Sequence, residues 1–292
     1  MKSGKPGVDH SAARAFAFEN GWVGAGWGLD ASPHEMSICN GSTDLDAYEA
    51  CAVEVFAGDA SLRRALSAIG SAMAVGDYCW SYDSHKGEYW CCKVIGDFQY
   101  HQGGPFDQYD LHMLRPCRWA KVGTAESVPG AIRRAFAGPF GTVTALSSDK
   151  NRIINAAKLA LGEPGQKIFG DLFDAAGPED LEDLIALYLQ SEGWLLLPST
   201  AKVSMASYEF VMVHKETGLR AGVQVKSGGV KQLRQQVADD FDEFFVFLAG
   251  KNPTVLGDDR VRLIEREDVR VFAERHRSLL PARLRAVWPP AR

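Results

Sequence analysis

The sequence predicts two mixed α/β (α+β) domains: a small β-barrel with helices, then a mixed sheet flanked by helices. A length of 292 residues suits two domains of about 100 to 200 residues each. Strand-like alternation broken by tight turns dominates residues 77–122, which favours a small, partly closed barrel. Helical and strand patterns alternate later in the chain. We therefore expect domains at residues 1–145 and 146–292.

The first domain opens on a segment without clear periodicity. Residues 1–17 are small and polar, so we expect a loose leader. From Asn20 the sequence NGWVGAGWGLD alternates in period two, which predicts a strand. Glycine inside a strand marks a bulge or the close approach of another backbone or a ligand.

The other elements of the first domain follow from periodicity and turn residues. Ser84-His85-Lys86-Gly87 predicts a hairpin turn, and Arg115-Pro116 predicts a break between two strands. Pro129 suits the first turn of a helix. The expected helices are Asp44–Phe56, Ser61–Met73 and Val128–Ala137, and the expected strands are Asp77–Tyr82, Glu88–Ile95, Asp110–Leu114 and Arg118–Val122.

The second domain begins after a connecting helix at about 149–161. Pro178 then opens a helix in which Leu181, Leu184 and Ile185 form an apolar stripe. Glu216-Thr217-Gly218 predicts the turn of a strand hairpin. The remaining expected elements are strands at Trp194–Leu197, Tyr208–Val213, Arg220–Lys226, Glu243–Leu248 and Val261–Ile264, and helices at Lys231–Asp239 and from Glu267 onward.

Composition narrows the functional classes. The net charge of −5 argues against a strongly basic coat for nucleic acid, although a local patch can still hold phosphates. No apolar run is long enough to span a bilayer, and the N-terminus lacks a secretory pattern, so we expect a cytoplasmic protein without membrane contact. The six cysteines form no CxxC pair and are expected to be reduced and structural, with a zinc site as the alternative.

One strand combines an apolar face with a polar one. In GVQVK, Val223 and Val225 share the face that enters a core, while Gln224 and Lys226 share the other. Glu209, on the preceding strand, is expected across from them. The Glu209 carboxylate, the Gln224 amide and the Val225 carbonyl offer the oxygen ligands that Mg²⁺ prefers, and Lys226 would orient water or stabilise phosphate charge. A polar-x-Lys pair is alternatively an ordinary solvated strand edge.

The order helix Glu182, strand Glu209, then Gln224-x-Lys226 resembles the PD-(D/E)xK nuclease superfamily, in particular its Mrr-like restriction endonuclease branch. The resemblance covers about residues 168–290. It implies that Glu209, Gln224 and Lys226 are catalytic, that Glu182 supports the site, and that Mg²⁺ or Mn²⁺ is the cofactor. The second acid of that family is usually Asp, so Glu209 is a departure that moves the metal ligand by about one methylene.

The first domain resembles a PUA-like or EVE-like barrel over about residues 18–145. The resemblance rests on the GW pair ending at Trp27, on GDYCWSYDSHKGEYWCCKVIGDFQY and on LHMLRPCRWA. It implies a pocket for a flipped, modified base, which requires aromatic faces and hydrogen bonds to the base edge. Alternatively, these aromatic side chains form the barrel core. The expected pocket residues are Trp27, Trp80 and Tyr82 for stacking, and Asp97 and Tyr100 for the edge.

Together these patterns favour a modification-dependent (type IV-like) DNA restriction endonuclease. Its substrate would be double-stranded DNA that carries modified bases, and cutting both strands would require a homodimer. Two alternatives belong to other classes. The second domain could be a degenerate nuclease that serves as a scaffold for a binding protein, or the chain could act on RNA, because PUA-like barrels also occur in RNA-modification systems.

Overall fold

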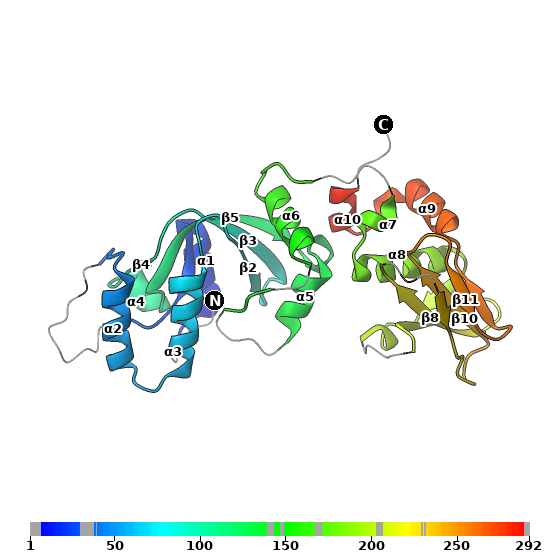
Figure 1. Cartoon of the computed structure of the whole chain (residues 1–292), viewed down its shortest axis with the longest axis horizontal. Helices are drawn as coiled ribbons and strands as arrows, with labels where there is room; N and C mark the ends of the chain where they lie inside the picture. Colours follow the sequence, from blue (N-terminus) through cyan, green and yellow to red (C-terminus); the bar gives the residue numbers. More distant parts are fainter. Residues whose placement is uncertain are drawn as a thin grey trace. The chain divides into compact units, whose positions relative to one another are not determined.

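The computed structural model divides the chain into two compact units, residues 1–165 and 166–292 (Figure 1). It describes residues 7–29, 38, 40–138, 143–146, 149–166, 171–202, 207–228, 230 and 232–288. The division falls later than the expected boundary near 145 because helix α6 (Lys150–Ala160) packs with the first unit. Ile153 of α6 lies in an apolar cluster with Tyr89 and Ile132.

The first unit is built on one antiparallel sheet that curves into a half-barrel. Strand order is β1-β5-β3-β2, and β4 also pairs with β5. The predicted hairpin of β2 and β3 is confirmed, with Ser81 directly opposite Trp90. The strands are β1 (Trp22–Ala25), β2 (Tyr78–Asp83), β3 (Glu88–Val94), β4 (Gln99–Tyr100) and β5 (Met113–Gly123).

Helices cover both faces of this sheet. Tyr48 of α2 and Ile69 of the π-helix η1 pack on the inner face with Cys92 and Met113, whereas Ile132 of α5 packs on the outer face. The predicted helices at 44–56, 61–73 and 128–137 are confirmed, the second as a short α-helix that continues as a π-helix. These elements are α2 (Leu45–Val55), α3 (Ala60–Ala65), η1 (Leu66–Ala72), α4 (Pro105–Tyr109), η2 (Ala125–Ser127) and α5 (Gly130–Ala137).

The expected loose leader is wrong for its described part, where helix α1 spans His10–Asn20. The Asp9 side chain accepts hydrogen bonds from the N–H groups of Ser11 and Ala12, and Gly21 ends the helix in a left-handed conformation. Alanine-rich content masked the helical period in the sequence. Two small residues of α1, Ala13 and Ala17, are buried against Leu111 and Leu114.

The expected break at Arg115-Pro116 is also wrong, because β5 runs without interruption through it. Proline cannot donate a ladder hydrogen bond, so it is tolerated only where no acceptor needs one. The carbonyl of Pro116 accepts from Ile95 N–H (2.8 Å), one residue beyond the end of β3. The N–H that Pro116 lacks would point toward Ile95, just past the end of β3. No hydrogen bond to a residue within β3 is therefore lost.

The second unit has a mixed five-stranded sheet of order β12-β10-β8-β7-β6 (Figure 1). Strands β8, β10 and β12 run parallel to one another, whereas β6, β7 and β8 are antiparallel neighbours. The predicted strands at 194–197, 208–213, 220–226, 243–248 and 261–264 are confirmed within two residues. They are β6 (Trp194–Leu196), β7 (Phe210–His214), β8 (Arg220–Lys226), β10 (Glu243–Leu248) and β12 (Val261–Leu263).

Helix α8 packs on one face of this sheet through the predicted stripe of Leu181, Leu184 and Ile185. Asp180 caps α8 by accepting a hydrogen bond from Gly177 N–H (2.7 Å). The helical elements of the second unit are α7 (Leu172–Ala175), α8 (Pro178–Ser191), η3 (Thr200–Lys202), α9 (Arg266–Arg275), η4 (Arg277–Leu279) and α10 (Ala282–Val287).

A helix was expected at Lys231–Asp239, and this prediction is wrong for residues 232–239; Lys231 itself lies outside the described residues. Strand β9 (Gln232–Arg234) instead pairs in parallel with β11 (Thr254–Leu256) to form a separate two-stranded sheet. Leu233 and Val255 pack against Phe244 and Val246 of the main sheet. Burying these side chains on the open sheet face outweighs the modest helical propensity of this segment.

The described cysteines are all free thiols, and Cys39 lies outside the described residues. Cys51, Cys91, Cys92 and Cys117 are buried. Burial raises the pKa of the Cys91 thiol to about 12, and it also raises the pKa of Cys92. Protonated, buried thiols are poor nucleophiles and poor metal ligands.

None of the helices in the described part of the chain combines the length and the apolarity needed to cross a lipid bilayer.

Glu163 fastens the segment after α6 to the sheet of the first unit. Its carboxylate accepts hydrogen bonds from the Tyr78 hydroxyl (2.7 Å), Lys93 Nζ (3.2 Å) and an Arg118 Nη (2.6 Å). The Tyr78 hydrogen bond, followed by Lys93, holds the pKa of the Glu163 carboxyl below its ordinary value of 4.5. The folded state therefore favours the ionised carboxylate.

Glu163→Gln should lower the melting temperature at neutral pH. A carboxyl whose folded pKa is lowered stabilises the fold above its unfolded pKa, and this contribution is lost as pH falls through the folded pKa. The difference from wild type should therefore shrink below about pH 4.5. Thermal unfolding followed by circular dichroism measures it, with the exposed Glu49→Gln as control. A difference that does not change with pH would show that the ionised form contributes nothing.

Candidate functional site

Glu209 lies immediately before β7, at the start of the β7–β8 hairpin. Its N–H donates to the carbonyl of Val223 (2.7 Å), and the next residue, Phe210, is the Cα partner of Val223. In an antiparallel pair this register puts Glu209 opposite Gln224. The predicted cross-strand placement of the acid is therefore observed.

Alternation along β8 separates its apolar and polar side chains. Val223 and Val225 are buried in the cluster that includes α8, so Gln224 and Lys226 extend from the other face. Gln224 Nε2 donates to Glu209 Oε1 (2.6 Å), and Lys226 Nζ lies 3.4 Å from the same oxygen. The amide and the ammonium thus converge on one carboxylate.

Exposure differs sharply among these three side chains. Gln224 is 2% exposed, whereas the side chains of Glu209 and Lys226 are 16% and 36% exposed. The buried amide holds the carboxylate in place, and the carboxylate and the ammonium are open to a ligand from solvent. The arrangement can present a negative oxygen and a positive nitrogen side by side to a polar substrate.

The Val225 carbonyl faces the same edge of β8. The carbonyl of Val223 points toward β7, because it accepts from Glu209 N–H. Carbonyls two residues apart on a strand point to the same side, so the Val225 carbonyl also points there. Phe210 is the first residue of β7. The Val225 carbonyl therefore lies beyond the end of the β7 ladder, on the side of β8 from which Glu209 approaches.

These donors fit a hard divalent cation by their chemistry. The set consists of the Glu209 carboxylate, the Gln224 amide oxygen and the Val225 carbonyl, and oxygen ligands of this kind are what Mg²⁺ takes, with water completing its shell. Only one of the three carries a charge. Within the described ranges no group of three or more His, Cys, Asp and Glu side chains is arranged to hold a metal. Any cation here would therefore depend on neutral oxygens and on the substrate.

Glu182 lies on α8 and is half-buried. The apolar stripe of that helix packs with Val223 and Val225, which is the face of β8 opposite Gln224 and Lys226. The structure therefore joins Glu209, Gln224 and Lys226 by direct contacts, while Glu182 belongs to a helix on the other side of the sheet. A supporting role for Glu182 stays a prediction.

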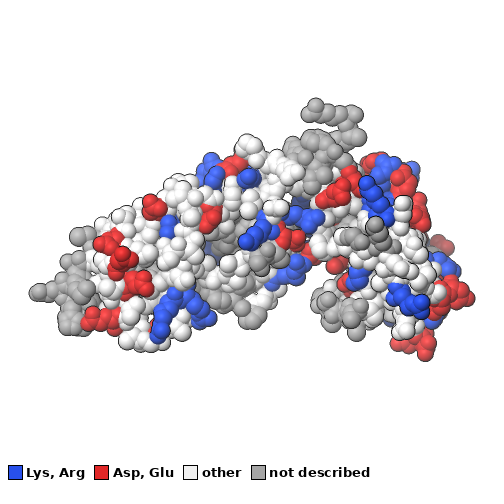
Figure 2. Space-filling view, in the orientation of Figure 1, with Lys and Arg blue, Asp and Glu red and all other residues white. Residues whose placement is uncertain are grey.

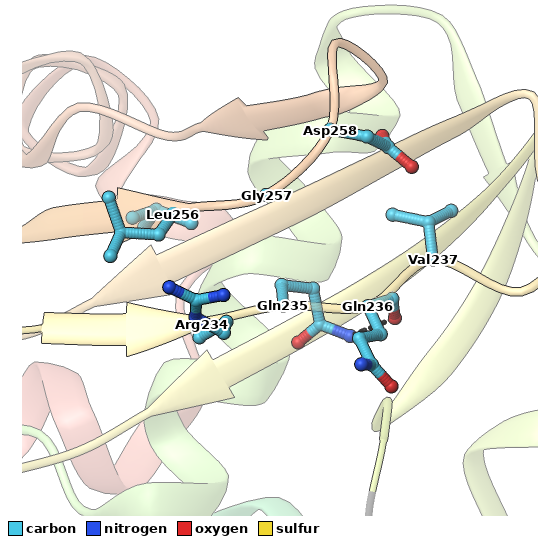
Figure 3. A pocket seen from close by; sticks show the side chains of 8 residues that line it. Arg234, Gln235, Gln236, Val237, Leu256, Gly257 and Asp258 are labelled. Carbon is cyan, nitrogen blue, oxygen red and sulfur yellow. Dashed lines mark hydrogen bonds between the residues drawn. The ribbon is translucent and has the colours of Figure 1, made fainter.

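A cavity of about 550 Å³ opens between the ends of β9 and β11 (Figure 3). Gln235 forms part of its wall, is 8% exposed, and donates from Nε2 to the carbonyl of Ser207 (3.3 Å), two residues before Glu209. No pattern in the sequence pointed to Gln235, because this segment was expected to be helical. Its lining residues are Arg234, Gln235, Gln236, Val237, Val255, Leu256, Gly257 and Asp258.

The structure does not bring together the five residues expected to bind a modified base. Trp27 packs against the inner cluster, donates from Nε1 to Asp59 (3.0 Å) and has a left-handed φ of 70°. Tyr100 is fully buried in that cluster, and its hydroxyl is bonded to Gln102 (3.0 Å). A side chain that is sealed in the core cannot contact a base edge.

The other three expected residues lie elsewhere. Trp80 and Tyr82 pack on the outer face of the sheet against Tyr89 and Ile132. Asp97 is 88% exposed, with Arg115 at 3.8 Å. The five residues were predicted to lie together because of their chemical type. Period-two alternation instead puts Trp80 and Tyr82 on the face opposite the cluster that holds Trp27 and Tyr100.

Three comparisons were made, with protein-family models, with curated proteins and with solved structures, and none of them gives a match to this chain.

Proposed function

We propose that this protein is a metal-dependent DNA endonuclease that acts on duplexes carrying modified bases. The convergence of Gln224 Nε2 and Lys226 Nζ on one oxygen of Glu209 carries the proposal. The order α8, β7, β8 and parallel β10 also agrees with the resemblance to the PD-(D/E)xK superfamily. In that reading the first unit recognises the modified base and the second cuts the backbone.

Each of these residues would have its own role in hydrolysis. Glu209, Gln224 and Val225 would hold Mg²⁺ or Mn²⁺ through oxygen atoms. When bound, such a cation neutralises charge on the phosphate and lowers the pKa of a coordinated water. Lys226, half-exposed beside Glu209, would donate to a phosphate oxygen and stabilise the charge that develops there. Gln224, buried and bonded to Glu209, would fix the position of the carboxylate.

The surface charge would let single basic side chains, rather than the protein as a whole, attract DNA. Figure 2 shows Lys and Arg interspersed with Asp and Glu over the visible face of the second unit. The net charge of −5 excludes long-range attraction by the whole chain. Phosphates would then be held by single groups such as Lys226 and the exposed Arg234 at the nearby cavity. Cleavage of both strands requires two such sites, so we expect a homodimer on DNA.

Digestion of a panel of duplexes tests this proposal. Matched duplexes carry 5-methylcytosine, 5-hydroxymethylcytosine, N6-methyladenine or no modification, and each is incubated with Mg²⁺, with Mn²⁺ or with a chelator. We expect cleavage of at least one modified duplex, only with a cation, and loss of that cleavage in Glu209→Gln. Binding without cleavage on every duplex would instead indicate a scaffold protein, and preferential binding to structured RNA would indicate an RNA-directed one.

A further inference from the structure

One oxygen of the Glu209 carboxylate is occupied by two nitrogen donors. Gln224 Nε2 donates to Glu209 Oε1 (2.6 Å), and Lys226 Nζ lies 3.4 Å from that same oxygen. A carboxylate oxygen has about two acceptor sites, so these two donors saturate it. A metal cation needs the same electron pairs. The contacts that assemble the trio therefore also oppose the binding of a cation.

Gln224 turns its nitrogen, rather than its oxygen, toward Glu209. The nitrogen and the oxygen of a carboxamide lie on opposite sides of one carbon atom. Joint coordination of a cation by Glu209 and Gln224 therefore requires the amide to turn over and to give up its hydrogen bond. Gln224 is only 2% exposed, so water does not readily replace that bond. The buried amide thus adds to the cost of admitting a cation.

The trio and the Val225 carbonyl together carry no net charge. Glu209 contributes one negative charge and Lys226 one positive charge, whereas the Gln224 amide and the carbonyl are neutral. The affinity of an oxygen site for a divalent cation depends on the number of charged ligands that it offers. The free protein should therefore bind Mg²⁺ or Mn²⁺ weakly.

Lys226 is the member of the trio that can move away. Its side chain is 36% exposed, whereas that of Glu209 is 16% exposed. Its ammonium ends a flexible four-carbon chain, and its contact with Glu209 is long for a charged hydrogen bond. A DNA phosphate offers anionic oxygens to this ammonium and brings a negative charge of its own. It would release Glu209 and make the site negative in one step.

We propose that the ion pair of Glu209 and Lys226 keeps the site closed to metal until a DNA phosphate takes over Lys226, so that DNA and the cation bind cooperatively. The inference rests on the proposed function and adds a regulation of the same site. By linkage, the duplex raises the affinity for the cation by the factor by which the cation raises the affinity for the duplex, and such factors are about 5 to 150.

Mn²⁺ binding to the full chain without DNA tests the closed state, with the loss of the electron paramagnetic resonance signal of hydrated Mn²⁺ as the readout. Lys226→Met keeps the aliphatic chain, removes the ammonium and should bind Mn²⁺ about fivefold or more tightly than wild type. Lys215→Met, in the exposed turn of the same hairpin, should stay within about twofold of wild type.

Gln224→Glu provides a second variant, because it replaces the nitrogen donor with another carboxylate. It should also bind Mn²⁺ more tightly than wild type without DNA, by about fivefold or more. The new carboxylate is buried, so the melting temperature of this variant shows whether it folds. Lys226→Met decides the question if it does not, since that substitution lies at a more exposed position.

A second titration adds a 5-methylcytosine duplex, in the cold so that the duplex stays intact. Wild type should bind Mn²⁺ about fivefold or more tightly with the duplex than without it. Mn²⁺ should raise the affinity for the duplex by the same factor, measured by fluorescence anisotropy. Glu209→Gln with the same duplex gives the Mn²⁺ that the DNA phosphates hold by themselves, and this background is subtracted.

The outcomes separate the closed site from the proposed function. Equal Mn²⁺ binding by wild type and Lys226→Met without DNA overturns the closed site, as does wild-type binding that the duplex leaves unchanged. Metal-dependent cleavage of a modified duplex would leave the function standing in both cases. Mn²⁺ that binds none of these proteins, with or without the duplex, overturns the metal site and the proposed function with it. Tighter binding in Lys226→Met but not in Lys215→Met, together with coupling to the duplex, supports the proposal.

Discussion

Lys226→Ala should reduce cleavage of a modified duplex by about a hundredfold or more, because removing one donor that stabilises developing charge costs about 10² to 10³ in rate. Lys226 is the only group in the trio with a positive charge, and its Nζ lies 3.4 Å from Glu209. Its side chain is 36% exposed, so the substitution should disturb packing little. Single-turnover cleavage with enzyme in excess over DNA measures the effect on the chemical step.

Lys215→Ala is the matched control for this experiment. Lys215 lies in the exposed turn that joins β7 to β8, on the same hairpin as Lys226. Its removal takes away one positive charge and should leave the rate within about twofold, because exposed charges contribute little on their own. Equal losses in both variants would reduce the role of Lys226 to general attraction of DNA. An unchanged rate in Lys226→Ala would remove it from the catalytic site.

Gly24→Ala should destabilise the first unit by about 3 kcal/mol or more, at the upper end of overpacking effects. A Cβ at Gly24 would lie 1.9 Å from the backbone carbonyl oxygen of Met113. Backbone atoms cannot turn away as a flexible side chain can, so β1 would have to move off β5. Denaturant unfolding followed by tryptophan fluorescence should show a lower midpoint for Gly24→Ala.

Gly138→Ala provides the comparison for that substitution. Gly138 follows α5 with a φ of −86°, and the nearest atom to a Cβ there is the Arg134 carbonyl oxygen at 4.0 Å. An added methyl group at such a position changes stability by less than about 1 kcal/mol, usually upward. A similar loss in both variants would contradict the close approach of β1 and β5.

Hydrophobic periodicity was sufficient to predict the elements that pack one apolar face against the core. Strands β8 and β10 match their predicted bounds, and α8 carries its predicted stripe. The secondary structure of the other segments depends on partners that are distant in the sequence. Pro116 continues a strand because β3 ends beside it, and residues 232–234 form a strand because Thr254–Leu256 pairs with them. Neither condition can be read from the local sequence.

The trio of Glu209, Gln224 and Lys226 was predictable because a hairpin fixes its own register. One turn between two strands places each residue opposite a known partner, and Glu209 falls opposite Gln224. The expected base pocket had no such constraint. Trp27 lies just beyond β1, and β1 does not pair with β2, the strand of Trp80, so aromatic type alone could not tell which face each side chain occupies.

The pairing of β1 with β5 joins segments that are far apart along the chain. Trp22 meets Pro116 and Ala25 meets Met113, so β1 is made by the ribosome long before its partner strand exists. Contacts so distant along the chain form late, since the loop between them must close first. We therefore expect the sheet of the first unit to close from its β2–β3 hairpin outward, with β1 docking as the last strand.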